Sequence, residues 1–210
     1  GEGGGSILRS LRRAGVEHLF NVCSLDSNPE FSPDVLIKVQ DLVQCLRKGT
    51  APVSITNTDW HIIWCSPPCT SYSAANTRRS KKKAETEMRA ADKVVQACFD
   101  LIEILKPICW FIENPDSGKN RLRNRPMMGK YKELMTSVTY CRYGRADRKA
   151  TLIVSNVPLT LLDCRIQGQE CMTKRLLGRH SRTAQSGPSV ATDGRVIPGT
   201  TQVEAQRVPE

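Results

Sequence analysis

Apolar residues occur in short runs that stop at turn-forming residues, and these runs predict buried strands. Clear runs lie at 18–25 (HLFNVCSL), 61–65 (HIIWC), 108–112 (ICWFI) and 151–155, with further strands expected near 35–39 and 138–143. Two of them end sharply, the second at Ser66-Pro67-Pro68 and the third at Glu113-Asn114-Pro115. The chain therefore contains several short, largely buried strands.

Apolar residues at spacings of three and four predict a long helix from Ala84 to Leu105, which Pro107 ends. A short amphipathic helix is expected at 7–14, ended by Gly15, and another at 131–135. Because apolar strands alternate with helices, the predicted fold class is α/β with a parallel or mostly parallel sheet.

The alternating pattern fails after Asn156. The remaining residues are rich in Gly, Pro, Ser, Thr and Gln, which is typical of irregular structure. We therefore divide the chain into a domain at 1–156, an irregular basic segment at 157–195 that could be a substrate-recognition loop, and a tail at 196–210 with a disordered composition.

Composition narrows the class of protein. No run of about 18 apolar residues occurs, so we expect no membrane-spanning helix. The 9 cysteines are odd in number and scattered, which indicates a reducing, intracellular compartment (the nucleus, if the source is eukaryotic) rather than a disulfide framework. We expect a monomer.

The net charge of +10 is concentrated in three segments, at 78–83, 119–132 and 142–149. Each segment follows a predicted strand, so together they predict one face that binds a polyanion. Solvated loops are the alternative for each segment taken alone. The side chains expected at nucleic-acid phosphates are Arg78, Arg79, Lys81, Arg121, Arg123 and Arg148.

Reactive side chains follow three of the predicted strands: Asp26, Cys69 and Glu113. In an open α/β sheet, ligands bind at the carboxyl ends of the strands. We therefore expect Cys69 and Glu113 to converge as a nucleophile and an acid. Taken singly, Cys69 could be a turn residue and Glu113 a helix-capping acid.

These segments resemble the cytosine-C5 DNA methyltransferases, especially their short phage- and virus-like members. Residues 66–73 (SPPCTSYS) resemble the nucleophile motif, and residues 110–115 (WFIENP) look like the Glu-Asn motif. Residues 3–26 are similar to the S-adenosylmethionine loop and the acid that follows the second strand, and residues 143–151 (YGRADRKAT) to the late motif. The resemblance covers about residues 1–156 in the family's order.

The resemblance implies a Rossmann-like fold, S-adenosyl-L-methionine as the cofactor, and DNA as the substrate. It implies a nucleophile at Cys69, an acid for cytosine N3 at Glu113, and a cofactor site formed by Gly3, Gly5, Ser6, Asp26 and Pro67. Adenine N6 methyltransferases instead have an aromatic residue after the two prolines, so Cys69 disfavours that class.

The chemistry explains why these residue types are needed. Cytosine C5 is a poor nucleophile, but addition of a thiolate to C6 makes C5 nucleophilic. A carboxylic acid can quench the charge that then develops at N3. The target base is hidden in a duplex, so it must be flipped out or lie in a single strand.

Two departures from the family pattern change the expectations. The late motif usually supplies an arginine where this chain has Thr151, so Lys149 is assigned to the catalytic set, with Arg148 as the alternative substitute. Gly1 stands where the family has a Phe, and no strand precedes the cofactor loop. That strand lies between the Asp26 strand and the Cys69 strand in this fold, so we expect a truncated chain and a sheet without its first, central strand.

Two other functions stay open. One is a non-catalytic nucleic-acid-binding relative that kept the fold and lost cofactor binding. The other is a tRNA cytosine-C5 methyltransferase, since the same chemistry serves both polymers.

Cys164, Cys171 and His180 form a second constellation, C-x6-C-x8-H. A structural zinc site needs four ligands, and a fourth is not obvious in the sequence. The sequence therefore assigns no metal ligands. The preferred interpretation is that these residues hold a loop together or are thiols without a common role.

Overall fold

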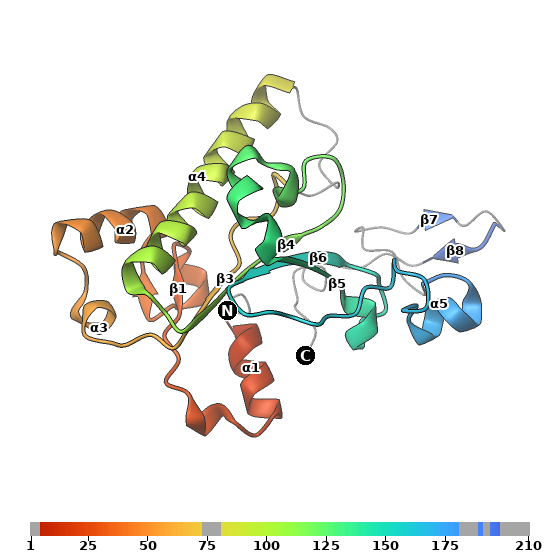
Figure 1. Cartoon of the computed structure of the whole chain (residues 1–210), viewed down its shortest axis with the longest axis horizontal. Coiled ribbons are helices and arrows are strands. Elements are labelled where there is room, and N and C mark those ends of the chain that lie inside the picture. The colour runs from red at the N-terminus through yellow and green to blue at the C-terminus, as the bar shows by residue number, and fades with distance from the viewer. Residues whose placement is uncertain (1–4, 73–80, 181–188, 191–193, 198–210) are drawn as a thin grey trace.

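The computed structural model describes residues 5–72, 81–180, 189–190 and 194–197 (Figure 1). Six of its shorter helices are α1 (Gly5–Arg13), η1 (Glu17–Leu19), η2 (Pro29–Phe31), α3 (Val53–Thr56), η3 (Leu122–Asn124) and η4 (Pro126–Leu134), where η marks a 3-10 helix. The predicted helix at 131–135 is thus the end of the 3-10 helix η4. None of the helices in the described ranges is both long and apolar enough to span a bilayer.

Two sheets carry the strands of the first 156 residues. β1 (Leu25–Asp26) pairs in parallel with β2 (Val35–Leu36). The larger sheet has the order β3 (Ile62–Cys65), β4 (Cys109–Pro115), β6 (Ala150–Ser155), β5 (Met135–Thr139). β3 is parallel to β4, whereas β6 is antiparallel to both of its neighbours.

The fold is therefore α/β with a mixed sheet in which β3, β4 and β5 run in one direction. The prediction of a parallel or mostly parallel sheet was wrong for β6, which runs antiparallel to β4 and to β5. β5 and β6 are joined by a short connection through η5 (Tyr140–Tyr143), and a connection of this length reverses the chain. β5 also begins and ends earlier than predicted, because residues 140–143 form the 3-10 turn. The strands predicted at 61–65, 108–112 and 151–155 are confirmed.

The prediction of a buried strand at 18–25 was wrong for most of its length. Only Leu25 and Asp26 form β1, while Glu17–Leu19 form η1. Leu19 and Phe20 are exposed. In the described part of the chain, β1 pairs with a strand on one side only, so no second neighbour covers the run.

Helix α4 (Lys81–Leu105) confirms the helix predicted at 84–105, and it holds the two sheets together (Figure 1). Val95 and Phe99 pack in one core cluster with Trp110 of the larger sheet. Leu101 packs in a second cluster with α2 (Val39–Lys48), which lies against the β1–β2 sheet. The two sheets are thus connected through helices in the described residues, and not through strand pairing.

The chain after β6 is irregular apart from α5 (Met172–Leu177) and the two short strands β7 (Ser189–Val190) and β8 (Val196–Ile197), which pair antiparallel. The tail predicted from residue 196 thus begins with a strand. Its remainder, residues 198–210, lies outside the described part.

Candidate active site

The loop that carries Cys69 leaves the end of β3 and is held from both sides. Asn114 of β4 donates a hydrogen bond from Nδ2 to the carbonyl of Pro67 at 3.1 Å. The backbone N–H of Tyr72 donates to the carbonyl of Cys69 at 3.0 Å. The hydroxyl of the buried Tyr72 donates to Asp92 of α4 at 2.9 Å. These contacts fix the position of Cys69 at the carboxyl end of the larger sheet.

Glu113 is part of β4 itself and pairs with Ile153 of β6. Its side chain is buried, and within the described residues its Oε1 atom has no hydrogen-bond partner. Lys149 forms an ion pair with it, with Nζ 3.9 Å from Oε1. Burial raises the pKa of Glu113, and the charge of Lys149 and a hydrogen bond from Ser66 offset only part of that rise.

Cys69, Glu113 and Lys149 influence one another electrostatically. Burial raises the pKa of the Cys69 thiol, the negative charge of Glu113 raises it further, and the positive charge of Lys149 lowers it. Burial lowers the pKa of Lys149, against the opposing effect of Glu113. The structure thus brings the three residues assigned to catalysis into one partly buried group, in which each charge shifts the titration of the others.

Further buried residues support this group. Lys149 Nζ lies 5.2 Å from the ring centre of Tyr140, which gives the ammonium an aromatic face. Arg145 forms a nearly buried ion pair with Asp147 at 2.7 Å. The sequence did not assign roles to Asn114, Arg145 or Asp147, although all three lie inside the segments that carried the family resemblance.

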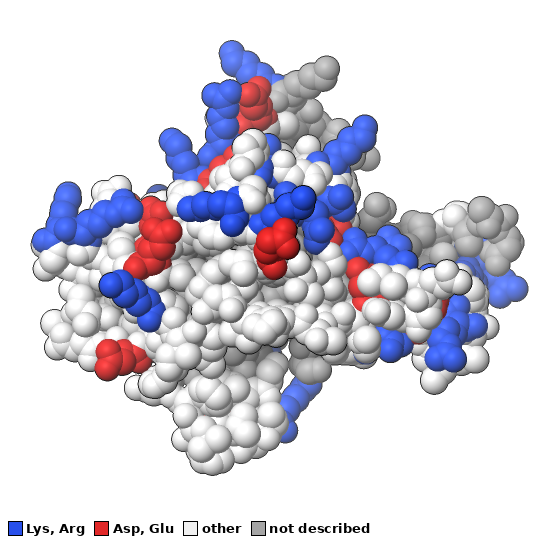
Figure 2. Space-filling model, in the orientation of Figure 1, with Lys and Arg blue, Asp and Glu red and all other residues white. Residues whose placement is uncertain are grey.

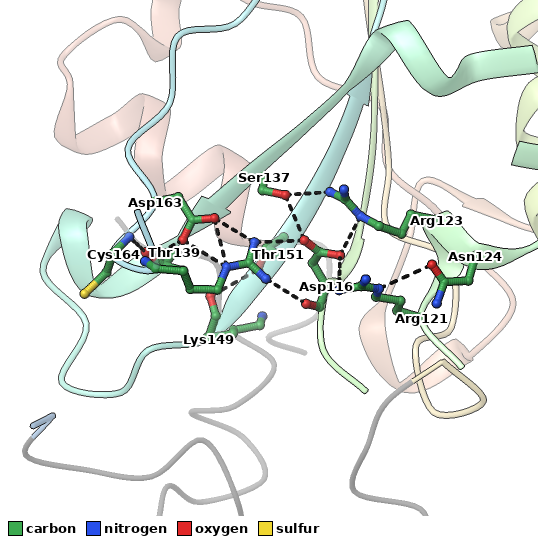
Figure 3. A network of polar contacts seen from close by, with 11 residues as sticks. Asp116, Arg121, Arg123, Asn124, Ser137, Thr139, Lys149, Thr151, Asp163 and Cys164 are labelled. Atoms are coloured by element: carbon green, nitrogen blue, oxygen red, sulfur yellow. Dashed lines mark hydrogen bonds and ion pairs between the residues drawn. The ribbon is translucent and has the colours of Figure 1, made fainter. Parts of the chain in front are cut away.

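Asp116, one residue beyond β4, is the centre of a polar network (Figure 3). This buried carboxylate forms ion pairs with Arg123 at 2.7 Å, Arg165 at 2.9 Å and Arg121 at 3.8 Å. Its backbone N–H also donates to the carbonyl of Ala150 in β6 at 2.9 Å. The network joins the segment that follows β4 to the irregular segment that follows β6, and no sequence motif indicated it.

Two of the arginines expected at phosphates therefore contact an internal acid. Arg121 and Arg123 keep about a third of their side-chain surface exposed, but both lie against Asp116. Of the other four, Arg148 is exposed, Lys81 is the first residue of α4, and Arg78 and Arg79 lie outside the described residues.

The remaining positive charge of the 119–132 segment comes mostly from exposed lysines. Lys119, Lys130 and Lys132 are exposed, whereas Arg125 forms an ion pair with Asp92 at 2.6 Å. Figure 2 shows Lys and Arg side chains gathered over α4 and the neighbouring 3-10 helices. This surface, rather than the arginines around Asp116, is the better candidate for a polyanion contact.

The residues assigned to the cofactor are divided between separate elements. Asp26 lies in β1 of the smaller sheet, where its Oδ1 accepts a hydrogen bond from the backbone N–H of Asn28 at 2.8 Å. Gly5 and Ser6 begin α1, and Gly3 lies outside the described residues. Pro67 belongs to the Cys69 loop of the larger sheet. The structure thus assembles the Cys69 group on the larger-sheet side and leaves the described cofactor residues distributed over α1, the smaller sheet and the Cys69 loop.

No protein-family model and no characterised protein matches this chain. Its function is therefore inferred from the geometry and chemistry of the Cys69 group.

Proposed function

We propose that this protein is a DNA (cytosine-5)-methyltransferase with a Rossmann-like fold, in which the described residues place no strand between β1 and β3. The observation that carries the proposal is the buried carboxyl of Glu113, beside the thiol of Cys69 and the ammonium of Lys149. Among the residues that the structure describes, its Oε1 has no hydrogen-bond partner. Leaving a buried polar atom unpaired is costly, so such an atom is typical of a site that receives its partner from a ligand. N3 of a cytosine is a partner of the right kind.

The chemistry of the first step follows from these three groups. The Cys69 thiolate forms a bond to C6 of the cytosine, and the electron pair of the C5–C6 double bond moves through the ring toward N3. N3 takes a proton from Glu113, which leaves a neutral adduct with a nucleophilic C5. The raised pKa of Glu113 favours the protonated form that this step needs.

The group can also form the thiolate without a change in its net charge. With a neutral thiol, an ionised Glu113 and a charged Lys149, the net charge is zero. Moving one proton from Cys69 to Glu113 keeps it at zero and leaves the thiolate facing the ammonium that lowers its pKa. Activation therefore needs no proton exchange with bulk water and places the proton on the group that delivers it to N3.

The residues assigned to the cytosine base fit the proposal better than the residues assigned to the cofactor. S-adenosyl-L-methionine, when bound, supplies an electrophilic methyl group. Asp26 at the end of β1 suits the hydroxyls of a ribose, and Gly5 and Ser6 open a helix of 9 residues. The separation of the β1–β2 sheet from β3 agrees with a Rossmann-like sheet without its central strand. Because the two sheets are unpaired, we derive no step through the cofactor.

The same separation favours one second candidate, a non-catalytic nucleic-acid-binding relative. A glycine loop binds a cofactor only when its position relative to the neighbouring strands is fixed, and in the described residues α1 has no place in either apolar core cluster of the sheets. This candidate predicts salt-sensitive binding of DNA without covalent chemistry at Cys69.

Covalent trapping tests the proposal. A DNA oligonucleotide with 5-fluorocytosine, incubated with the protein and S-adenosyl-L-methionine, should form an adduct at Cys69 that survives denaturation. Peptide mapping identifies the thiol, and the Cys69→Ser protein should form no adduct. An adduct at Cys65, or equal trapping by Cys69→Ser, would remove Cys69 from the mechanism. Binding of the oligonucleotide without any adduct would favour the non-catalytic relative, and trapping only on the matching RNA would favour a tRNA substrate.

A further inference from the structure

Three cysteines and one histidine come together near η5 and α5 in the described residues: Cys141, Cys164, Cys171 and His180. Their ligand atoms all lie within 4.8 Å of one another. Sγ of Cys164 and Nε2 of His180 are 3.5 Å apart, and the Cys141, Cys164 and Cys171 side chains form a buried cluster of their own. Cys141 is thus the fourth member that the C-x6-C-x8-H spacing lacked.

These separations are close to those of a tetrahedral zinc site. Zn–S bonds of about 2.3 Å and Zn–N bonds of about 2.0–2.1 Å place the ligand atoms of a tetrahedron about 3.5–3.8 Å apart. The Cys164–His180 distance already has this value. An upper limit of 4.8 Å for the other pairs leaves only small inward shifts to complete the tetrahedron.

The four ligands come from three separate parts of the chain. Cys141 lies in η5 between β5 and β6, and Cys164 lies in the loop after β6. The backbone N–H of Cys164 donates to Oγ1 of Thr139 at 2.6 Å, which holds that loop against the end of β5. Cys171 precedes α5, and its N–H donates to Sγ of Cys164 at 3.3 Å.

His180 reaches the cluster because the chain turns sharply after α5. Gly178 ends the helix with a φ of +69°, a conformation that glycine adopts without strain. The turn returns the chain toward Cys164.

From this arrangement we propose that Cys141, Cys164, Cys171 and His180 bind one structural zinc ion. Three sulfur ligands and one imidazole nitrogen suit zinc, and they do not suit the hard cations Ca²⁺ and Mg²⁺. Four protein ligands complete the coordination shell, so the site has no open position for a water or a substrate. Its role is therefore structural and separate from the chemistry at Cys69.

The charges around the cluster agree with this assignment. Three thiolates and one Zn²⁺ ion carry a net charge of −1, which nearby cations would balance. Nζ of Lys174 donates to the carbonyl of Cys164 at 3.3 Å, and Arg142, next to Cys141, donates to the carbonyl of Glu170 at 2.8 Å.

Helix α5 also needs an interaction other than apolar packing to hold it against the rest of the fold. Helix α5 has no buried residue, and its Met172, Leu176 and Leu177 are exposed, so apolar packing does not explain its position. A zinc ion would anchor both ends of α5 through Cys171 and His180. It would also fix the start of the segment that carries Arg165, the arginine that pairs with Asp116 beside the active site.

The first experiment measures metal content. The full chain, purified under reducing conditions without a metal-affinity tag, should contain about one zinc ion per molecule by mass spectrometry of the metal. Cys164→Ser and His180→Ala should lose most of it, whereas Cys23→Ser, which alters a thiol outside the cluster, should keep it. Equal zinc content in all of these proteins, or a wild-type protein that cannot bind added zinc, would overturn the proposal.

A second measurement covers the case in which a ligand variant fails to fold. His180→Cys should keep the metal with four sulfur ligands. After replacement of zinc by Co²⁺, its thiolate charge-transfer absorption should be stronger than that of the wild type, while Cys23→Ser should match the wild type. Chelation of the wild type should expose the 157–180 segment to protease. Two results would contradict a four-ligand zinc site. One is a disulfide between Cys164 and Cys171 in protein purified under reducing conditions, and the other is a Co²⁺ absorption spectrum of His180→Cys that equals that of the wild type.

Discussion

The two sheets differ in the extent of their backbone pairing and apolar burial. In the larger-sheet region (β3, β4, β5 and β6 with the loops that follow them), all residues of β6 are buried and β4 is paired on both sides. In the smaller-sheet region (β1, β2 and α2), each strand has two residues, and Leu36 is 56% exposed. Backbone pairing and apolar burial therefore support the first region much more strongly than the second.

The difference separates two parts of one proposed reaction. Cys69, Glu113 and Lys149 all belong to the larger-sheet region. Glu113 lies in β4, Lys149 directly precedes β6, and Asn114 of β4 holds the Cys69 loop through the carbonyl of Pro67. Asp26 belongs to the smaller-sheet region. The part of the chemistry that activates the cytosine is thus pre-organised, while the part that would hold the methyl donor depends on the weaker region.

The largest expected contrast is in stability. Leu152 of β6 is fully buried, so Leu152→Ala should lower the free energy of unfolding by about 2–5 kcal/mol. Leu36 of β2 is more than half exposed, so Leu36→Ala should cost less than about 1 kcal/mol. Urea unfolding of the two variants measures both values. Equal losses would mean that the smaller sheet is packed as firmly as the larger one.

A second contrast concerns the reactivity of the Cys69 thiol. Glu113 raises the pKa of Cys69 and Lys149 lowers it, so Glu113→Gln should move the alkylation profile of Cys69 to lower pH and Lys149→Met should move it to higher pH. At a pH below the pKa, a thiol whose pKa is lower by about one has a thiolate fraction about tenfold larger. Iodoacetamide labelling of Cys69, followed by peptide mapping across a pH series, measures the displacement of the profile.

The matched control for this experiment is Lys48→Gln, which removes an exposed charge from the smaller-sheet region. Its Cys69 profile should coincide with that of the wild type. An unchanged profile in both Glu113→Gln and Lys149→Met would show that burial alone, and not the charges of these two residues, controls the thiol.

The smallest expected effect is on DNA binding. If the exposed Lys119, Lys130 and Lys132 contact phosphates, replacing all three with glutamine should reduce the slope of log K against log salt by about 0.9 per lost contact. Arg123→Gln should change the slope less, because Arg123 pairs with Asp116. Fluorescence anisotropy at several salt concentrations gives the slopes. A slope unaffected by the lysine changes would identify that surface as merely solvated.

Patterns along the chain predicted the parts of the fold that depend on local sequence. The apolar runs located β3, β4 and β6, and the spacing of three and four located α4, because both signals come from neighbouring residues. The run at 18–25 misled the prediction, since an apolar run becomes a buried strand only if other strands flank it. The antiparallel course of β6 depends on tertiary pairing, which the strand pattern did not reveal.

The site divides in the same way. Cys69 and Glu113 follow directly from the ends of two predicted strands, and the structure brings both beside Lys149. Cys141 was missed because it precedes Cys164 by more than twenty residues and lies in a strand-like run, where a thiol is normally a small apolar side chain. Asp116 was missed because its partner Arg165 lies in a segment without any pattern.

The most direct test of the Cys69 mechanism uses no methyl donor and therefore examines the larger-sheet region alone. Addition of the Cys69 thiolate to C6 makes C5 basic, so the C5 hydrogen of cytosine in a DNA oligonucleotide should exchange with deuterium from the solvent, as measured by mass spectrometry. The wild type and Cys23→Ser should catalyse this exchange equally. Glu113→Gln should slow it by about 10²- to 10⁴-fold, and Cys69→Ala should abolish it. Exchange that persists in Cys69→Ala, or its absence in a wild-type protein saturated with the oligonucleotide, would contradict the account.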